Sequence, residues 1–330
     1  MEIYSPPFHI TNVMLSRTAS ISEKVGEIGS LRDLEKMPHL RRSNRIQSIH
    51  ASLKIEANSL SLSQVRDVIN GRPVLGDPAE IQEVRNACAV YEKLTDINPY
   101  SLKELMAVHE IMTKGLLEES GVFRRGEEGV FQGDQCIFMA PPARLVPSLM
   151  SDLFTWMERE KDELHPLILS SVFHYEFVFI HPFADGNGRM ARLWHTALLA
   201  AWKPVFAYIP LESQVEHFQQ EYYAAISQCH AVGDSDRFVE FMLEQIDRVL
   251  DEVILRGRQE GAEASEYVKR LLAVMDYGIP YTTKYLMGQL GLKSRETFRK
   301  NYLNPAMELK LVEMTIPDHP TSRNQRYIRR

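Results

Sequence analysis

The sequence has few cysteines and no long apolar run, and both absences restrict what the protein can be. Its 330 residues include three cysteines, Cys88, Cys136 and Cys229, which are far apart and form no C-x-x-C pair. A disulfide framework and a zinc knuckle are therefore excluded, and a reducing, cytoplasmic compartment is expected. No run of about 18 apolar residues exists, so no membrane-spanning helix is expected. The N-terminal segment also lacks the basic start and apolar core of a signal peptide.

Charge is unevenly distributed along the chain. The whole sequence has 38 Lys and Arg against 44 Asp and Glu, a formal net charge of −6. Residues 281–330 alone hold ten basic and four acidic residues, a net +6, which leaves −12 on the first 280 residues. A basic C-terminal part on an acidic body predicts two units with different partners. Nucleic acid is a candidate partner for the basic part, and a protein-interaction or packing module with a solvated basic face is the alternative.

Apolar residues recur at helical spacing over most of the sequence, which predicts a mainly α protein. Pro166 fits the first turn of a helix that is apolar nearly all round and is therefore expected to be central and buried. Two Ser-x-x-Glu patterns predict capping boxes at the start of helices. The predicted helices include about 43–58, one opened by Ser101–Glu104, 146–159, one beginning at Pro166, 189–202, and one opened by Ser213–Glu216.

Residues 121–142 interrupt the helical pattern. They are rich in glycine and end in Pro141-Pro142, which predicts a loop and a small β-hairpin with strands near 129–132 and 136–139.

The C-terminal residues follow a different plan. Residues 256–266 are polar and contain glycine, and we interpret them as a domain linker. Three short helical stretches and two β-like runs follow, which predict a winged helix over 267–330. The expected division is an N-terminal helical region at 1–95, a core at 96–255, the linker and the winged helix.

Residues 181–192 read H-P-F-A-D-G-N-G-R-M-A-R and lie between two strongly apolar helical segments. Gly186 and Gly188 permit a tight loop whose backbone N–H groups form an anion nest. The loop leads directly into a helix N-terminus, which adds unpaired N–H donors and a favourable field. Arg189 and Arg192 are three residues apart, so they share a helix face, and both can bind phosphate oxygens.

The same segment supplies a metal ligand and a base. Asp185 offers a hard oxygen suited to Mg²⁺. His181 can hold a neutral imidazole near pH 7 and accept a proton from a hydroxyl nucleophile. No G-x-x-x-x-G-K-[ST] is present, so the site is not a P-loop. Together these residues predict phosphate-transfer chemistry.

This segment resembles the signature of the Fic family, H-[PFI]-F-x-[DE]-G-N-G-R-x-x-R, at every defining position, and a wider resemblance covers roughly residues 40–250. Fic proteins that resemble this chain are mostly adenylyltransferases, which move AMP from ATP to a Ser, Thr or Tyr hydroxyl of a target protein. The resemblance implies a Fic-type helical core and a protein adenylyltransferase that uses ATP and Mg²⁺. It implies these roles: general base, His181; loop anchor, Phe183; Mg²⁺ ligand, Asp185; anion hole, Gly186, Asn187 and Gly188; β- and γ-phosphate ligands, Arg189 and Arg192.

Two further segments resemble parts of this family. The predicted hairpin lies where the family has its flap, which aligns a target segment by strand addition. Its residues over the nucleotide would be Cys136, Ile137, Phe138 and Met139. The pair Tyr222-Tyr223 matches a tyrosine pair that lines the adenine pocket in many relatives, although two tyrosines on a helix are also common in a plain core.

Residues 52–58, S-L-K-I-E-A-N, resemble the inhibitory motif of the family, [ST]-x-x-x-E-[GN]. Ser52 and Glu56 are four residues apart and share one helix face. In that class the Glu pairs with the second Arg of the signature, here Arg192, so a carboxylate and the γ-phosphate compete for one guanidinium. The sequence departs from the motif at Ala57, where Gly or Asn is usual.

Several alternatives stay open at the level of the sequence. The same fold could transfer phosphate instead of AMP, or remove AMP with Glu56 positioning a water. A protein of another class, a DNA-binding regulator that uses the core as a nucleotide sensor, is also compatible with the residues. The target protein and the oligomeric state, a homodimer included, are not determined.

Overall fold

The computed structural model describes residues 4–30, 38–132, 135–262 and 265–329. It is mostly helical, as the apolar periodicity predicts, and it contains two small antiparallel hairpins. The chain forms two compact units, residues 1–23 with 47–249 and residues 24–46 with 250–330. Among the described residues, no helix combines the length and the apolar composition needed to cross a membrane.

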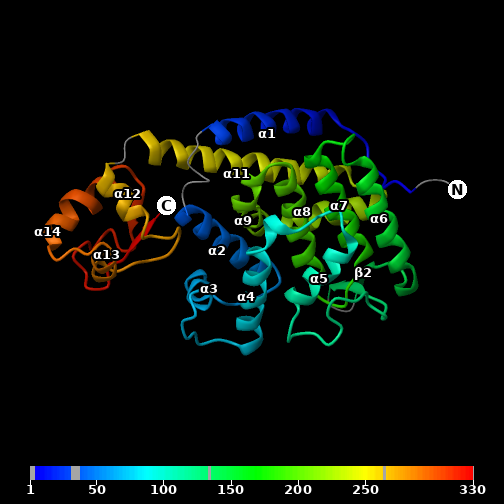
Figure 1. The fold of residues 1–330 in the computed structure, drawn as a ribbon, viewed down its shortest axis with the longest axis horizontal. Helices are drawn as coiled ribbons and strands as arrows, with labels where there is room; N and C mark the ends of the chain where they lie inside the picture. The colour runs from blue at the N-terminus through cyan, green and yellow to red at the C-terminus, as the bar shows by residue number, and fades with distance from the viewer. Residues whose placement is uncertain (1–3, 31–37, 133–134, 263–264, 330) are drawn as a thin grey trace. The chain divides into compact units, whose positions relative to one another are not determined.

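The first unit contains most of the helices (Figure 1). Three helices contribute residues to both units: α1 (Asn12–Ser30), α2 (Pro38–Ile55) and α11 (Asp236–Ala262). The remaining elements of the first unit are α3 (Leu62–Ile69), α4 (Pro78–Tyr91), η1 (Leu94–Asp96), α5 (Leu102–Met112), β1 (Gly129–Gln132), β2 (Gln135–Met139), η2 (Ala143–Leu145), α6 (Val146–Glu160), α7 (Pro166–Ile180), α8 (Asn187–Trp202), η3 (Pro204–Tyr208), α9 (Leu211–His217) and α10 (Gln219–Val232).

Helices α7 and α8 form the centre of this unit and pack against each other. Pro166 is in the first turn of α7, where its missing N–H costs no hydrogen bond, and nearly every side chain of the helix is buried. Large apolar side chains of both helices, such as Phe173, Phe177 and Trp194, are removed from solvent. Because burying each such side chain stabilises the fold by about 1.5–3 kcal/mol, this pair is a rigid support for the loop that joins it.

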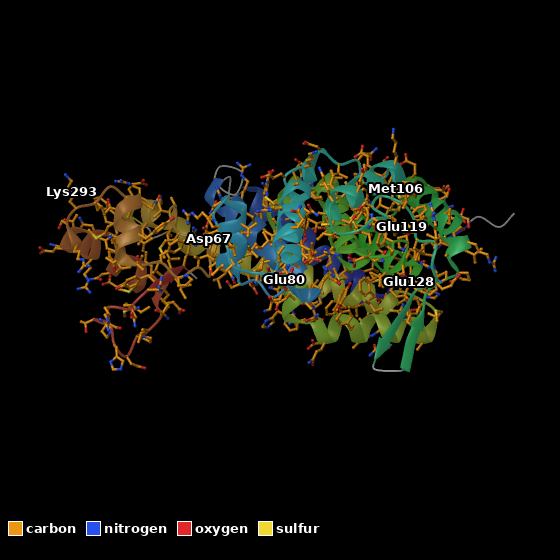
Figure 2. All side chains as sticks on the ribbon, turned by 90° about the horizontal axis from the view of Figure 1, so that it is seen from below. Asp67, Glu80, Met106, Glu119, Glu128 and Lys293 are labelled. Atoms are coloured by element: carbon orange, nitrogen blue, oxygen red, sulfur yellow. The ribbon has the colours of Figure 1, made fainter. Side chains whose placement is uncertain are left out.

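The β1–β2 hairpin extends away from the helices of the first unit, as Figure 2 shows beside the labelled Glu128. Its strands pair antiparallel from Gly129 opposite Met139 to Gln132 opposite Gln135, with a bulge between Val130 and Phe131. Both strands lie where the alternation and the flanking glycines predict them.

The C-terminal part of the second unit has three helical segments followed by a hairpin, the order predicted from the sequence. The segments are α12 (Glu266–Leu272), α13 (Thr283–Gln289) and a continuous stretch made of α14 (Arg295–Thr297), the π-helical η4 (Phe298–Leu303) and α15 (Asn304–Glu308). Strands β3 (Val312–Met314) and β4 (Tyr327–Arg329) pair antiparallel.

The structure places the ends of two helices differently from the sequence prediction. The helix predicted at about 43–58 is α2, which ends at Ile55, because Ala57 has a left-handed backbone with φ of 67° that no α-helix can include. The segment predicted as a polar linker, 256–266, is helical as far as Ala262, since α11 continues into it. Its Arg, Gln, Glu and Ala residues favour a helix and outweigh the two glycines.

The capping boxes also differ from the sequence prediction. Ser213 lies inside α9, which begins at Leu211 directly after Pro210, and the helix with Tyr222 begins only at Gln219. At Ser101 half of the predicted box forms, since the Ser101 hydroxyl accepts from the Glu104 N–H while the Glu104 carboxylate accepts from the Asn98 N–H.

One carboxyl group in the centre of the first unit is buried without a basic partner in any contact that the structure gives it. Glu176 of α7 is 5% exposed and accepts a 3.0 Å hydrogen bond from the hydroxyl of Tyr4. Burial raises the pKa of Glu176 to about 7, and the bond from Tyr4 offsets only part of this shift.

The raised pKa of Glu176 predicts a pH-dependent stability. The folded state holds the proton of Glu176 more tightly than the unfolded state does. The contribution of this proton to the free energy of unfolding is therefore favourable below pH 4.5, declines as the pH rises, and is lost above about pH 7. Glu176→Gln should therefore match the parent at pH 5 and exceed its stability at pH 8.5 by on the order of 1–3 kcal/mol. Thermal melts at both pH values measure this; equal differences at both would contradict the assignment.

Candidate active site

The loop between α7 and α8 carries the signature residues in an unusual backbone conformation. His181 ends α7 with φ of 52° and ψ of 61°, in the left-handed region, and its N–H donates to the Phe177 carbonyl at 3.0 Å. Gly186 begins α8 with φ of 81°, and a Cβ there would lie 3.3 Å from Thr113. Only glycine meets both conditions without strain, which explains its presence at this position.

The imidazole of His181 is oriented for proton transfer. Its Nδ1 lies 3.3 Å from the Val178 carbonyl, which can only accept a hydrogen bond, so Nδ1 carries the proton and Nε2 is the free acceptor. Burial lowers the pKa of His181, and the bond to Val178 opposes this shift only in part. The ring is therefore neutral near pH 7, as a general base requires.

His109 of α5 holds the loop in place through contacts with the loop residues Phe183 and Asp185. Phe183 is fully buried and stacks on His109 with ring centroids 3.6 Å apart. Because His109 Nδ1 accepts from the Gly121 N–H, its Nε2 carries the proton and donates to the Asp185 carbonyl, each at 3.0 Å. Burial lowers the pKa of His109, so the ring stays neutral and keeps this tautomer.

Two further side chains fix the loop backbone. The Asn187 amide binds both main-chain groups of Phe183, accepting from its N–H at 2.9 Å and donating to its carbonyl at 2.7 Å. Arg124, which is 3% exposed, donates to the carbonyls of His181 and Pro141, each at 2.6 Å. Since Pro141 follows β2, this one guanidinium connects the base of the hairpin to the loop between α7 and α8.

Arg192 and the end of α2 form the central ion pair of the site. Arg192 Nη2 donates to Glu56 Oε1 at 2.7 Å and to the Ser52 carbonyl at 2.9 Å, while its Nε donates to Ser52 Oγ at 3.2 Å. The guanidinium side chain is 2% exposed and the Glu56 side chain 35%. Burial alone would lower the pKa of Arg192, but the Glu56 carboxylate together with Tyr222 and Tyr223 outweighs this effect, and the net pKa is raised.

The Glu56 carboxylate also lies against the first turn of α8. A Cβ added to Gly188 would overlap Glu56 Oε1 and lie 3.1 Å from an Arg192 nitrogen. Gly188 is thus required for close approach of an anion, not for a special backbone angle. The carboxylate therefore lies at a helix N-terminus, a position that favours anions.

Two carboxylates, those of Asp185 and Glu83, bind the guanidinium of Arg189. It donates to Asp185 at 2.8 Å and to Glu83 of α4 at 3.0 Å, and its side chain is 4% exposed. Glu83 in turn accepts from the Asn58 amide at 2.8 Å, two residues beyond Glu56. Both signature arginines therefore have acidic partners, and one of those partners also holds the end of the segment that carries Glu56.

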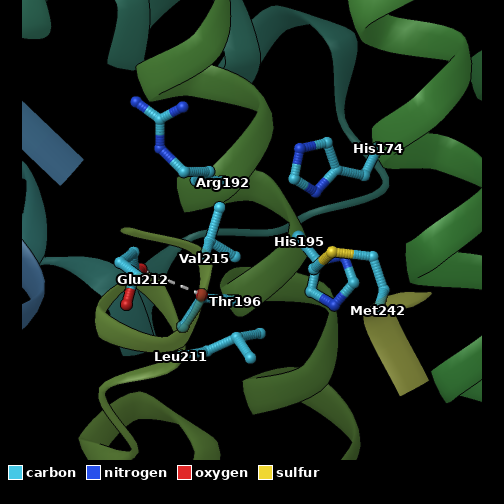
Figure 3. Close-up of a pocket in the computed structure, with 8 residues that line it drawn as sticks. All are labelled: His174, Arg192, His195, Thr196, Leu211, Glu212, Val215 and Met242. Atoms are coloured by element: carbon cyan, nitrogen blue, oxygen red, sulfur yellow. Dashed lines mark hydrogen bonds between the residues drawn. The ribbon is translucent and has the colours of Figure 1, made fainter. Parts of the chain in front are cut away.

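Polar and apolar side chains line a narrow space next to Arg192, among them His174, Glu212 and Leu211 (Figure 3). The hydroxyl of Tyr222, on α10, is 3.0 Å from His174 Nε2, which connects α10 to α7. Glu212 is 1% exposed and accepts from the hydroxyls of Ser48, Tyr91 and Thr196 at 2.7, 2.9 and 3.2 Å. Since Ser48 and Ser52 are both on α2, these bonds fix the helix whose end carries Glu56.

The residues predicted for the flap and the adenine pocket are only partly gathered around the loop. Phe138 stacks on His230 with centroids 4.0 Å apart, and Met139 is exposed. Tyr222 is 2% exposed, while Tyr223 is 48% exposed. Cys136 and Ile137 belong to β2, but their side chains lie outside the described part of the structure.

Asp185 has the chemistry needed for a magnesium ligand. Its side chain is 59% exposed, and the one oxygen that Arg189 binds leaves the other accessible. A single carboxylate suits Mg²⁺, which usually keeps several waters and takes further oxygens from substrate phosphates. The residues present therefore fit this ion.

Comparisons with known proteins assign the chain and its fold to one family. Residues 99–199 match the family model described as Fic/DOC family, and residues 266–328 match the model described as filamentation induced by cAMP protein Fic-like, C-terminal domain. A Fic family protein from Desulfovibrio desulfuricans G20 is 45% identical, with a TM-score of 0.74 over 99% of this chain and 98% of that one. This chain belongs to the Fic family.

More distant relatives share parts of the chain. Fic-1 from C. elegans has the same fold with a TM-score of 0.57 over 72% of this chain, at 22% identity. A protein named protein adenylyltransferase Fic from Culex quinquefasciatus is 31% identical over 261 residues, which are 71% of this chain and 49% of that protein. The chain thus spans about half the length of this curated Fic relative.

Three residues that shape the site were not identified from the sequence: His109, Arg124 and Glu83. The sequence did contain an indication of His109, because this residue shares the apolar face of its helix with Leu105 and Met112. A histidine on a buried apolar face usually has a specific hydrogen-bonding role. Arg124 and Glu83 have charged neighbours in the sequence, and no sequence pattern distinguishes them from ordinary surface residues.

The end of α2 is strained at the residue where the Fic inhibitory motif has Gly or Asn. Asn58 N–H donates to the Leu53 carbonyl and Ala57 N–H to the Lys54 carbonyl, at 3.1 and 3.0 Å, which is the Schellman pattern. Its left-handed position is filled by Ala57, at a cost of roughly 1–2 kcal/mol for a residue with a Cβ.

Ala57→Gly should therefore stabilise the protein by about 0.5–1 kcal/mol, since the relief of strain exceeds the added entropy of the unfolded chain. Denaturant unfolding measures the change, with Ala51→Gly, inside the same helix, as the control that should destabilise by a similar amount. A loss of stability in Ala57→Gly would contradict the left-handed assignment.

Proposed function

We propose that this Fic protein is a protein adenylyltransferase that transfers AMP from ATP to a Ser, Thr or Tyr hydroxyl of a target protein and is inhibited by its own Glu56. The observation that carries the proposal is the Glu56 carboxylate bound to Arg192 against Gly188, at the N-terminus of α8. A site built for anions and occupied by an internal anion fits an enzyme whose substrate phosphates compete with that group. The names of the curated relatives support the same activity.

The proposed reaction is an in-line displacement at the α-phosphorus of ATP. The acceptor hydroxyl oxygen forms the new P–O bond, His181 Nε2 takes the hydroxyl proton, and the bond to the bridging oxygen breaks so that pyrophosphate leaves. Backbone N–H groups at the start of α8 would stabilise the charge on the phosphoryl oxygens. Fixed donors suit this step, because positioning alone can supply several kcal/mol of rate enhancement.

Asp185 would hold Mg²⁺, which, when bound, neutralises charge on the phosphates. The chain's own groups bind and orient the nucleotide: Arg192 would take the γ-phosphate once Glu56 is displaced, and Arg189 the neighbouring phosphate. The β1–β2 hairpin would align an extended target segment by strand pairing, which brings its hydroxyl to His181. The low cysteine content suits a cytoplasmic enzyme and target.

His181→Ala should abolish transfer while ATP binding stays within about twofold of the parent, because the base acts on the acceptor and not on the nucleotide. In the parent, the rate should rise with pH through a pKa below the ordinary 6.5 of histidine and be constant above it. Labelled-AMP transfer and calorimetric ATP titration measure the two effects. Transfer at the parental rate by His181→Ala would contradict the role of this residue.

Glu56→Gly should raise AMP transfer sharply. Release of the carboxylate lets Arg192 bind the γ-phosphate, and correcting a misalignment of about 1 Å is worth on the order of 100-fold in rate. The measurement is label transfer from α-labelled ATP to the protein itself and to a native lysate. Lys54→Gly is the matched control, since it places a glycine in the same last turn of α2, keeps Glu56, and should leave the rate low.

Mass analysis of the modified protein distinguishes the rival reactions. A gain of AMP supports the proposal, whereas a gain of phosphate identifies a phosphotransferase and a loss of AMP from a modified target identifies a hydrolase. Equal activity of Glu56→Gly and the parent, with ATP bound by both, would contradict autoinhibition.

A further inference from the structure

The second unit has a basic groove that the proposed reaction does not use. The groove has a volume of about 1160 Å³ and runs between the helical stretch 295–308 on one side and the loop between β3 and β4 on the other. Its cationic lining residues are Lys284, Arg295, Arg299, Lys300 and Arg323, all exposed.

These five cations have no ion pair among the described residues, although Glu296 and Glu308 also line the groove. Arg329, in contrast, is buried and stabilises the fold of this unit. Arg329 is 3% exposed and donates to the carbonyls of Leu272 and Met275 at 2.7 and 3.1 Å. Since the fold does not use the five exposed cations, their concentration on an otherwise acidic protein indicates an anionic partner.

The groove lies along a helix-turn-helix. Helix α13 is followed by a tight turn in which Gly291 has φ of 67°, and then by the stretch 295–308. Figure 2 labels Lys293 in this turn. Arg295 and Arg299 are four residues apart, so they project from the same face of the second helical stretch. An α-helix rises about 1.5 Å per residue and is about 10–12 Å across with its side chains. The diameter of such a stretch therefore matches the width of a B-DNA major groove, about 12 Å.

A π-helical turn occurs in the middle of this stretch, where Asn304 N–H donates to the Arg299 carbonyl. Pro305 explains it: proline has no N–H, and its ring would collide with the carbonyl four residues earlier in a regular α-helix. The extra residue per turn moves that carbonyl aside and places Arg299 and Lys300 within the widened turn. Such turns are rare and occur frequently at functional sites.

We propose that this groove binds double-stranded DNA, with the stretch 295–308 in the major groove and the β3–β4 loop, through Arg323, on the adjacent phosphate backbone. Duplex RNA is a poorer fit, because its major groove is too deep and narrow for a helix. Unneutralised arginines and lysines supply the sequence-independent part of such binding.

The test is fluorescence anisotropy of the full chain with a labelled 20-base-pair DNA duplex between 50 and 200 mM salt. Saturable binding should weaken with salt, and the triple variant Arg295→Gln, Arg299→Gln, Lys300→Gln should bind at least about tenfold more weakly at 100 mM salt. The slope of log K against log salt should become shallower by about 2 to 3, since each lost phosphate contact removes about 0.9.

The matched control is the triple variant Lys93→Gln, Lys103→Gln, Lys114→Gln, which removes three exposed charges from the first unit. It should bind DNA within about twofold of the parent. Three outcomes would overturn the proposal: no binding of duplex DNA at 50 mM salt, equal weakening in both triple variants, or binding of duplex RNA or polyglutamate in preference to duplex DNA.

Discussion

The buried ion pair between Arg192 and Glu56 is the interaction on which the site depends. Removing a guanidinium from water costs several kcal/mol unless its N–H groups find acceptors, and here Glu56 and two Ser52 oxygens supply them. The pair therefore fixes the end of α2 against the first turn of α8. Any anion that binds at that turn must replace the carboxylate, so in the proposed function this one cation would couple substrate binding to inhibition.

The loop before α8 illustrates a second constraint, the need to hold a strained backbone without flexibility. His181 adopts a left-handed conformation, which persists only where neighbouring contacts determine it. The stacked Phe183 and His109, the two bonds of Asn187, and the clamp of Arg124 provide those contacts. Neutral histidines suit this buried environment, because removing a charged imidazolium ring from water is unfavourable. The same burial keeps His181 neutral and therefore able to accept a proton.

The two parts of the chain use arginine for different purposes. In the first unit the signature arginines are buried and paired with Glu56, Asp185 and Glu83. In the second unit, Arg329 completes the core while the arginines of the groove stay exposed and without ion pairs among the described residues. This difference in solvation, not in residue type, separates the arginines of the fold from those available to partners.

The sequence by itself determined the local elements and the chemistry of the signature. The apolar run after Pro166, the hairpin strands and residues 181–192 depend on neighbours within a few positions, so their patterns suffice. Tertiary structure alone decided which distant groups complete the site. Glu83 lies 106 residues from Arg189 and Arg124 lies 57 residues from His181, and no local spacing encodes these contacts. The end of α2 was also decided there, because Ser52 and Glu56 bind Arg192 of a distant helix while Ala57 adopts a conformation that its own propensity disfavours.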